Sequence, residues 1–287
     1  MKPRVCFSFS IGVAIVLFAL VGCVKEPPPP LRVGTNVWPG YETLYLARSL
    51  GYYDRTPIRL VDYPSGTEQV RAYRNGEIEA AGISLDQALV LAATEPDVRI
   101  VTVMDFSAGG DAILGKPNIK NLLDLKGRRV GVESTALGAF VITRALGKVG
   151  LSPKDVQIVP LQVSEHERAF KQGKIDAVVT FGPPMTKLLA TGAKILFDSR
   201  QIPGEIVDVL IVRSSAIQNQ PDTVQALING RFRALDYLQS HPQDAASRIA
   251  PRTGVTPSQF LQSLAGLSQP NLQENQRLLS KDDPTLL

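Results

Sequence analysis

The chain has 287 residues, of which 44% are hydrophobic and 20% charged, and this ordinary globular composition argues against a largely disordered protein. The formal net charge is +4, and without Lys2 and Arg4 at the basic start it is +4 − 2 = +2. A charge this small does not indicate nucleic acid as a partner. Two cysteines, both before residue 24, and two histidines exclude a disulfide framework and a cysteine- or histidine-rich metal site in the folded body, so we expect neither a metal nor a cofactor.

The first 23 residues have the pattern of an export signal. Residues 1–4 are basic, residues 5–21 are apolar or small, and the tetrapeptide at residues 20–23 resembles a bacterial lipobox. This resemblance implies lipidation of Cys23 and a membrane-anchored protein in the periplasm or outside the cell. The alternative is an uncleaved anchor, since residues 5–24 are about long enough to cross a bilayer. Residues 24–30 contain four consecutive prolines and predict a stiff linker.

Residues 31–51 predict a strand, a tight turn and a helix. Leu31, Val33 and Val37 fall on one face of a strand, Trp-Pro-Gly follows at residues 38–40, and apolar residues then recur at helical spacing until Gly51. The first N–H groups of such a helix lack intrahelical partners and form the positive end of the helix dipole. We therefore expect this turn to form one side of a small-molecule site.

The elements that follow alternate between strand and helix. Strands are predicted at residues 57–63, 78–83 and 98–104, and helices at residues 68–76 and 87–94. The resulting order, βαβαβαβ, predicts a parallel sheet covered by helices on both faces.

An internal repeat then appears with an offset of 97 residues. Arg-Val-Gly at residues 32–34 recurs at residues 129–131, and YRNGEIEA at residues 73–80 recurs as FKQGKIDA at residues 170–177, where 129 − 32 = 97 and 170 − 73 = 97. Two similarities with one offset and one order of elements predict two related α/β lobes.

The second lobe repeats the alternation, and helices end the chain. Further strands are predicted at residues 128–133, 155–161, 175–180, 193–197 and 206–212, with helices at residues 136–149, 165–172, 183–190, 223–238, 242–249, 257–264 and 272–279. The last four helices need a surface to cover, and the first lobe offers one. We therefore predict that residues 31–104 and 208–287 form lobe I and residues 105–207 form lobe II.

Four segments resemble the substrate-binding proteins of ABC importers, in particular the binders of sulfonates, taurine, nitrate and thiamine precursors. They are GTNVWPGYETLYLARSLGYY at residues 34–53, RNGEIEAAGIS at 74–84, DLKGRRVGV at 124–132 and KQGKIDAVVT at 171–180. The resemblance implies a type II periplasmic-binding-protein fold, in which two lobes joined by two crossing strands close on a ligand. It also implies a monomer that delivers its ligand to an ABC permease. The family usually has a further helix beyond the end of this chain, which implies a thinner helical cover over lobe I.

Ligands of open α/β sheets bind beyond the carboxyl ends of the strands, where helix N-termini gather. This rule selects polar and aromatic residues in the turns after the strands and at the two crossings between the lobes. The candidate ligand-binding residues are Asn36, Trp38, Tyr41, Glu42, Ser65, Gly66, Thr67, Ser84, Asp86, Asp105, Glu133, Ser134, Thr135, His166, Thr180, Phe181 and Asp208. The repeat places Trp38 opposite Thr135.

Each candidate also has a plainer explanation. Trp38 is either an aromatic platform for a ligand or a packing residue over the turn. The serines and threonines are equally typical helix caps. Asp86 is stabilised by the helix dipole with or without a ligand, and His166 is explained as an exposed residue of a first helical turn.

The charges of the candidate site favour a ligand with a cationic centre. Five carboxylates fall at or near it, and none of the turns contains an arginine. A purely anionic ligand would be repelled there, so we expect an amine, an amidine or a zwitterion. The carboxylates are Glu42, Asp86, Asp105, Glu133 and Asp208.

The function expected from these patterns is solute binding for import. A binding protein read by a membrane receptor is the first alternative, because sensing needs the same lobe closure. An enzyme on the same fold is the second, although the chain has no G-x-S-x-G, G-x-x-x-x-G-K-[ST] or G-x-G-x-x-G motif. A related enzyme that makes a thiamine pyrimidine uses a cysteine-rich loop, and this chain has no cysteine after Cys23.

Overall fold

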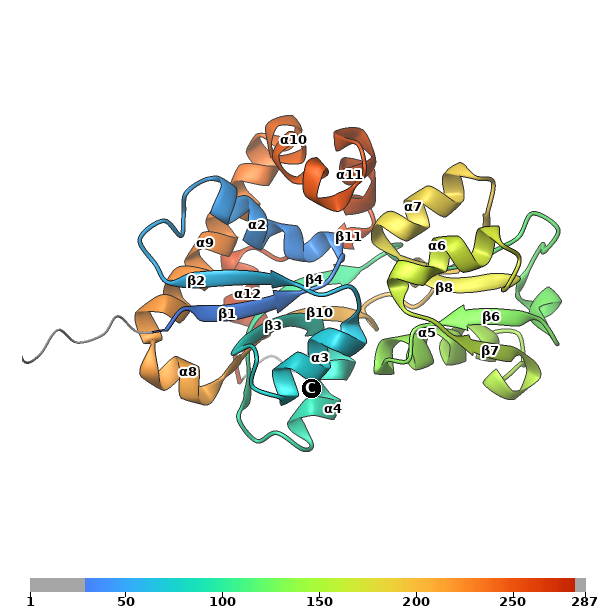
Figure 1. The fold of residues 1–287 in the computed structure, drawn as a ribbon, viewed down its shortest axis with the longest axis horizontal. Coiled ribbons are helices and arrows are strands. Elements are labelled where there is room, and N and C mark those ends of the chain that lie inside the picture. The colour runs from blue at the N-terminus through green and yellow to red at the C-terminus, as the bar shows by residue number, and fades with distance from the viewer. Residues whose placement is uncertain (1–28, 282–287) are drawn as a thin grey trace, which may run out of the picture.

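The computed structural model describes residues 29–281. The expected signal sequence, the lipidation site Cys23, most of the proline linker and the last six residues lie outside this part of the chain. The described residues form two α/β lobes, each built on its own sheet (Figure 1). Among them, no helix combines the length and the apolar character that a membrane span requires.

The first lobe contains a six-stranded sheet. Its strands are, in spatial order, β11 (Leu267–Ser268), β4 (Val98–Ser107), β10 (Val207–Arg213), β3 (Ala80–Ser84), β1 (Leu31–Thr35) and β2 (Ile58–Asp62). Strand β1 pairs in parallel with β2 and β3, as the alternating pattern predicts. Strand β10 lies between β3 and β4 and runs antiparallel to both. The four strands of the predicted βαβαβαβ order, β1 to β4, therefore run in one direction, and β10 enters between β3 and β4 from the opposite direction when the chain returns to this lobe.

The second lobe contains a five-stranded sheet. Its strands are, in spatial order, β7 (Gln157–Pro160), β6 (Arg129–Val132), β8 (Ala177–Phe181), β5 (Asp111–Gly115) and β9 (Lys194–Asp198). Strand β5 runs antiparallel to β8 and β9 and was not among the predicted strands. The chain crosses to this sheet between β4 and β5 and returns between β9 and β10. The lobe boundaries at residues 105 and 208 stay a prediction.

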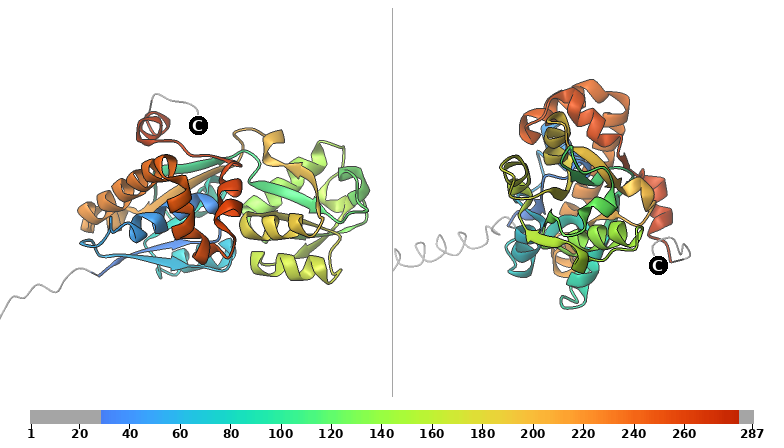
Figure 2. Two further views of the ribbon diagram at one scale, coloured as in Figure 1. Left: turned by 90° about the horizontal axis from the view of Figure 1, so that it is seen from above. Right: turned by 90° about the vertical axis from the view of Figure 1, so that its right-hand side faces the viewer.

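Helices cover both faces of each sheet (Figures 1 and 2). One face of the first sheet packs on α2 (Glu42–Ser49), α9 (Pro221–Ser240), α10 (Pro242–Thr253) and α11 (Pro257–Leu264), and the other on α3 (Gly66–Arg74), α4 (Leu85–Ala92) and α12 (Leu272–Leu278). The short α8 (Ser214–Asn219) follows β10. In the second lobe, α5 (Ala136–Gly147) covers one face and α6 (Val163–Lys171) and α7 (Gly182–Ala190) cover the other.

The predicted repeat is present in three dimensions. The Arg32 guanidinium donates to Glu79, which lies just before β3, and the Arg129 guanidinium donates to Asp176, which lies just before β8. In each lobe the carboxylate also accepts the backbone N–H of the same arginine, at 2.9 Å for Glu79 and 3.1 Å for Asp176. Each ion pair therefore joins two neighbouring parallel strands, β1 and β3 in the first lobe and β6 and β8 in the second, by the same contacts 97 residues apart (129 − 32 and 176 − 79).

Strand β4 carries a bulge at Met104, which decides where the next residue points. Val103 pairs with Val209 and Asp105 pairs with Asp208, so Met104 has no partner on β10. A bulge reverses the face on which the following side chains lie, and it therefore brings Asp105 onto the face of Asp208. Two buried side chains hold it: Asn275 of α12 accepts the Val103 N–H at 2.7 Å, and Arg231 of α9 donates to the Met104 carbonyl at 2.6 Å.

Candidate functional site

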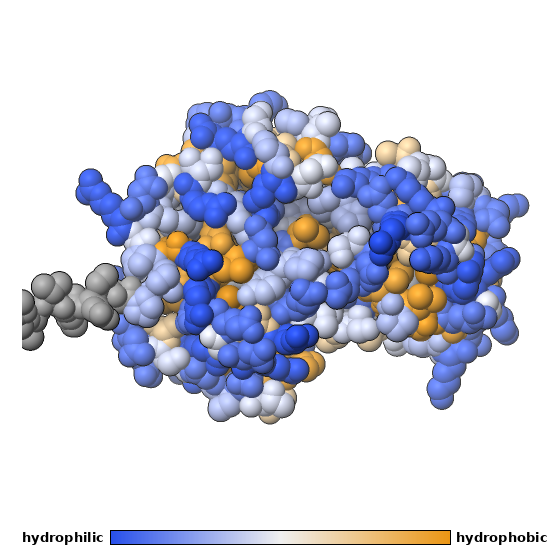
Figure 3. Space-filling view, in the orientation of Figure 1, coloured by the Kyte–Doolittle hydropathy of each residue, from blue (hydrophilic) through white to orange (hydrophobic). Residues whose placement is uncertain are grey.

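The two lobes meet where the carboxyl ends of β1 and β3 face those of β6 and β8 (Figure 1). On the face shown in Figure 3 the lobes are in contact along this boundary. A small space of about 20 Å³, called the central space below, lies between them. Six of its eight lining residues are predicted site residues, and Gln87 and Leu137 are the additions. The lining is Asn36, Trp38, Tyr41, Ser84, Gln87, Leu137, Phe181 and Asp208.

The turn after β1 positions the aromatic side chains of the central space. The Asn36 side chain accepts the Trp38 backbone N–H at 3.0 Å, and Pro39 then begins a short 3-10 turn, η1 (Pro39–Tyr41). Gly40 is required in this turn, because a Cβ atom there would lie 1.8 Å from the Asp105 carboxylate. The backbone can therefore approach the carboxylate closely while Trp38 and Tyr41 turn their polar atoms inward.

Two buried aspartates accept those polar atoms. The Trp38 indole N–H lies 3.1 Å from the nearer Asp105 oxygen, and the Tyr41 hydroxyl donates to Asp208. Asp105 is fully buried and Asp208 is 3% exposed. The two residues are direct partners on the neighbouring strands β4 and β10, so their carboxyl groups are held on the same face of the sheet.

Burial makes this pair hard to ionise. Loss of hydration raises the pKa of Asp105 to about 7, although the Trp38 hydrogen bond and the charge of Arg231 oppose the rise. Burial also raises the pKa of Asp208 well above its usual range, and the negative charge of Asp105 adds to this effect. Arg231 is itself buried, and this lowers the pKa of its guanidinium to about 10. Its positive charge favours ionisation of Asp105, as a bound cation would.

Two more carboxylates belong to the same electrostatic cluster. Asp111 at the start of β5 has a pKa raised to about 7, first by burial, and its charge raises the pKa values of Asp105 and Asp208. Asp86 also has a raised pKa, caused first by burial. One oxygen each of Asp86 and Asp111 is buried without a hydrogen-bond partner among residues 29–281. Asp208 lines the central space, and the charges of Asp86, Asp105 and Asp111 act on it, whereas Arg231 is the one buried cation among residues 29–281. This balance suits a cationic group.

Asp111 is the member that the sequence analysis missed. It follows Gly109 and Gly110 at the first crossing and begins the apolar run Ala112–Leu114. A short apolar run after two glycines is a strand signal that could have located it.

Contacts of side chains and backbone groups join the lobes around the central space. The rings of Trp38 and Phe181 meet edge to face, with centroids 5.5 Å apart. The Glu133 carboxylate accepts the Thr67 backbone N–H at 3.2 Å, and the Gln162 amide donates to Glu68 at 3.1 Å. The Glu133 carboxylate therefore occupies the N-terminus of α3.

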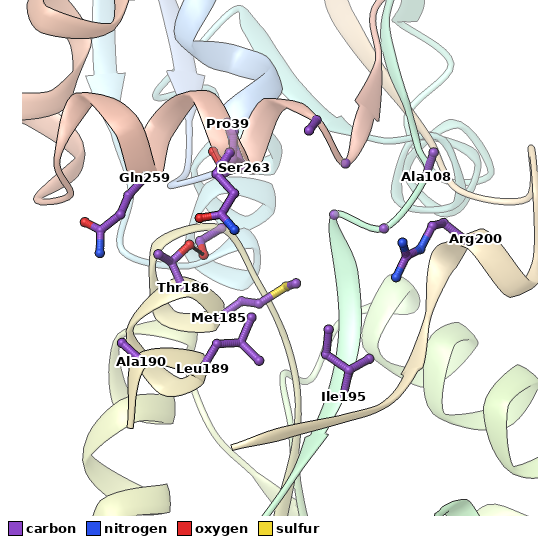
Figure 4. A pocket seen from close by; sticks show the side chains of 16 residues that line it. Pro39, Ala108, Met185, Thr186, Leu189, Ala190, Ile195, Arg200, Gln259 and Ser263 are labelled. Atoms are coloured by element: carbon purple, nitrogen blue, oxygen red, sulfur yellow. Dashed lines mark hydrogen bonds between the residues drawn. The ribbon is translucent and has the colours of Figure 1, made fainter. Parts of the chain in front are cut away.

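Larger cavities lie on either side of the central space. One of 490 Å³ opens between α7 and α11, where Met185 and Thr186 face Gln259 and Ser263 (Figure 4). None of the predicted site residues lines it. The other, of 350 Å³, lies between α3, α4 and the start of α5, and its lining includes the predicted residues Thr67, Ser134 and Thr135.

The structure does not bring every predicted residue to these spaces. Glu42 is 1% exposed and forms a bidentate ion pair with Arg252 of α10, so its carboxylate is used within lobe I. His166 and Thr180 are fully buried inside the second lobe, with the His166 Nδ1 atom 3.2 Å from the Thr180 hydroxyl. The explanation of His166 as an exposed first-turn residue is therefore wrong, and burial lowers its pKa to about 4.

Several predicted polar residues do act as helix caps. Ser65 accepts the Glu68 N–H, and Thr135 accepts the Gly138 N–H at 3.0 Å. Ser84 and Gln87 form a capping box at the start of α4. Gly66 and Ser134 lie beside the first two caps, at the boundary between the lobes. Their expected contacts with a ligand stay predictions.

Comparison with known proteins identifies relatives of the chain. The family model described as NMT1/THI5 like matches residues 38–245. The taurine-binding periplasmic protein of Escherichia coli (strain K12) is 25% identical over 202 residues, which are 67% of this chain and 63% of that protein, less than two thirds of its length. A putative thiamine biosynthesis protein of Haemophilus influenzae is 24% identical over 83% of this chain and 76% of its own length.

Solved structures support the fold assignment. The alkanesulfonate-binding protein SsuA from Xanthomonas axonopodis pv. citri, bound to MOPS, superposes with a TM-score of 0.74, 22% identity and coverage of 86% of this chain and 88% of that one. The desulfurization enzyme DSZB superposes with a TM-score of 0.63 at 18% identity, covering 86% of each chain. The likeness confirms the periplasmic-binding-protein fold, and because both binders and an enzyme share it, function has to be argued from the site.

Proposed function

Since the chain belongs to the NMT1/THI5-like family, we propose that it is an extracytoplasmic solute-binding protein of an ABC importer. Its ligand is a small organic solute with a cationic centre, bound between the lobes and released to a permease. Relatives named as taurine-binding and aliphatic sulfonates-binding proteins support the role of solute binder. The expected lipidation of Cys23 and the proline linker are part of the same proposal, because they would tether the binding domain beside the permease.

The observation that carries the proposal is the buried pair Asp105 and Asp208. Two carboxylates face each other on adjacent strands, two more lie nearby, and burial raises the pKa values of all four. A primary or tertiary ammonium group would offset this repulsion, and the Trp38 and Tyr41 rings beside it favour a cation further. Taurine and MOPS, which appear in the names of two relatives, each combine an amine with a sulfonate.

Binding requires movement of the lobes, because 20 Å³ cannot hold an organic solute. We propose that the lobes separate at the crossings that follow β4 and precede β10, the strands that carry Asp105 and Asp208. The ligand then replaces part of the Trp38–Phe181 contact and is enclosed when the lobes close again. Closure around a charged solute strengthens its contacts with the carboxylates by excluding water.

Native mass spectrometry of the protein as purified tests the proposal first, because a co-purified solute would reveal its mass. Calorimetry then compares taurine, MOPS and ethanolamine with nitrate and methanesulfonate. We expect binding of amine-bearing compounds, and at least a tenfold loss of affinity in Asp208→Asn. Asp54→Asn, which changes an exposed aspartate, is the matched control. Tight binding of nitrate or methanesulfonate without binding of any amine would refute the proposed ligand class.

A further inference from the structure

The lining of the 350 Å³ cavity beside the central space combines hydrogen-bond donors with the apolar side chains of Val70 and Val90. It lies between the outer faces of α3 and α4 in the first lobe and the start of α5 in the second. Arg71 and Arg74 belong to its lining, and neither guanidinium has an ion-pair or hydrogen-bond partner among residues 29–281. Because they are three residues apart on one helix, both lie on the same side of α3. Two unpaired guanidinium groups at the edge of one cavity favour an anion.

The start of α5 adds donors from the other lobe. Ser134, Thr135 and Ala136 line the cavity, and Thr135 caps this helix of 12 residues. The N–H groups of its first turn have no intrahelical acceptors and carry the positive end of the helix dipole. The corresponding end of α3 is already occupied by the Glu133 carboxylate, whereas no carboxylate is bound to the start of α5 among the described residues.

Gln87 connects the cavity to the central space. Its side chain lines both, it is only 8% exposed, and its Oε1 atom accepts the Ser84 hydroxyl at 3.0 Å. Its Nε2 group has no acceptor among residues 29–281 and lies 3.1 Å from the place where a Cβ atom on Gly66 would sit. The N–H groups of this amide are therefore available to a ligand atom that accepts hydrogen bonds.

The nearby carboxylates are already engaged. Glu68 accepts a hydrogen bond from Gln162, and Glu133 accepts the Thr67 N–H. Neither carboxylate pairs with Arg71 or Arg74 among the described residues. The boundary between the lobes is therefore bipolar, with four carboxylates at its centre and two arginines with a helix N-terminus at its side.

We propose that Arg71, Arg74, the first turn of α5 and the Gln87 amide form an anion subsite for a zwitterionic solute. This inference rests on the proposed function: the cationic end of the solute lies against Asp105 and Asp208, and its sulfonate, carboxylate or phosphonate end lies in the cavity. The subsite takes donors from both lobes, so an anionic end bound there also holds the lobes together.

Calorimetry with matched probes tests the subsite. Taurine and MOPS carry both charges, whereas ethanolamine and morpholine carry only the amine. The double variant Arg71→Ala, Arg74→Ala should lose at least tenfold in affinity for the zwitterions that the wild type binds and keep the wild-type affinity for the amines. Both arginines are exposed, so the fold should persist, and Arg55→Ala, which changes another exposed arginine of lobe I, should bind like the wild type.

The outcomes separate the two proposals. Unchanged affinity of the double variant for a zwitterion that the wild type binds would overturn the subsite and leave the proposed function standing. Equal losses for zwitterions and amines would also overturn it, because the arginines would then act on the fold or on the whole cleft. Failure of the wild type to bind any amine or zwitterion would overturn the proposed ligand class, and the subsite with it.

Discussion

Replacement of Asp105 by asparagine should stabilise the protein without ligand, and increasingly so as the pH rises. The pKa of Asp105 is about 7 in the folded protein and 3.8 for the ordinary group, a difference of about 3 units. Between pH 3.8 and pH 7 the folded protein binds a proton at Asp105 that the unfolded chain has released. The free energy of unfolding therefore falls as the pH rises from 3.8 to 7, and it stays at the lower value above pH 7. At about 1.36 kcal/mol per unit the full cost is about 4 kcal/mol.

Asparagine removes this cost while keeping an oxygen to accept the Trp38 N–H. Structural relaxation and water entry reduce the cost of burying a charge, so we expect about half of this value. The free energy of unfolding of Asp105→Asn should exceed that of the wild type by about 2 kcal/mol at pH 8 and differ little from it at pH 4. For a chain of this size, a gain of about 2 kcal/mol raises the midpoint temperature of thermal unfolding by about 4 to 8 °C. Thermal unfolding followed by circular dichroism at pH 4, 6 and 8 measures it, with Asp54→Asn as control. A variant that is less stable than the wild type at pH 8, or a difference that shrinks as the pH rises, would refute the reasoning.

Three further predictions concern other contacts. Arg252→Met leaves the buried Glu42 carboxylate without its partner and should lower the free energy of unfolding, measured by urea titration, by about 3 to 5 kcal/mol. The double variant Arg252→Met, Glu42→Gln should recover part of this loss. No recovery would contradict the ion-pair explanation. Glu133→Gln weakens the contact with the Thr67 N–H and should enlarge the radius of gyration in X-ray scattering of the ligand-free protein, whereas an unchanged radius would show that this contact does not hold the lobes together. Trp38 is the only tryptophan and touches Phe181 across the boundary, so Phe181→Ala should shift its fluorescence to longer wavelength by admitting water, and an unshifted spectrum would count against that packing.

Much of the fold follows from local patterns in the sequence. The period-2 runs and the glycine and capping signals locate most strands and helices to within a few residues, and the offset of 97 predicts that Arg32 and Arg129 play equivalent roles. Strand β5 was missed because it has only five residues, and after Asp111 these show no alternation between apolar and polar side chains. The antiparallel direction of β10 depends on how the chain returns between the lobes, which local periodicity does not reveal.

The residues that line the central space were easier to predict from the sequence than the electrostatic contacts around them. Turns after the strands do supply Asn36, Trp38 and Tyr41, because strand ends gather at one edge of a sheet. The pairing of Asp105 with Asp208 requires the bulge at Met104, and no residue type marks a bulge of this kind. Arg231 is distant in sequence and lies in the middle of a helix, so nothing near it indicates that it neutralises a cleft residue.

The position of β10 has a consequence for the order of folding during synthesis. All strands of the second sheet lie between residues 111 and 198 and can pair as soon as that stretch has been made. The first sheet cannot: β3 and β4 precede this stretch, yet they meet only through β10 at residues 207–213. The early half of lobe I therefore waits with two unpaired strand edges until the later lobe has been made, which exposes it to aggregation for that time. Asp208 arrives on the strand that fills this gap, so the acidic pair is assembled only after the second lobe has been made.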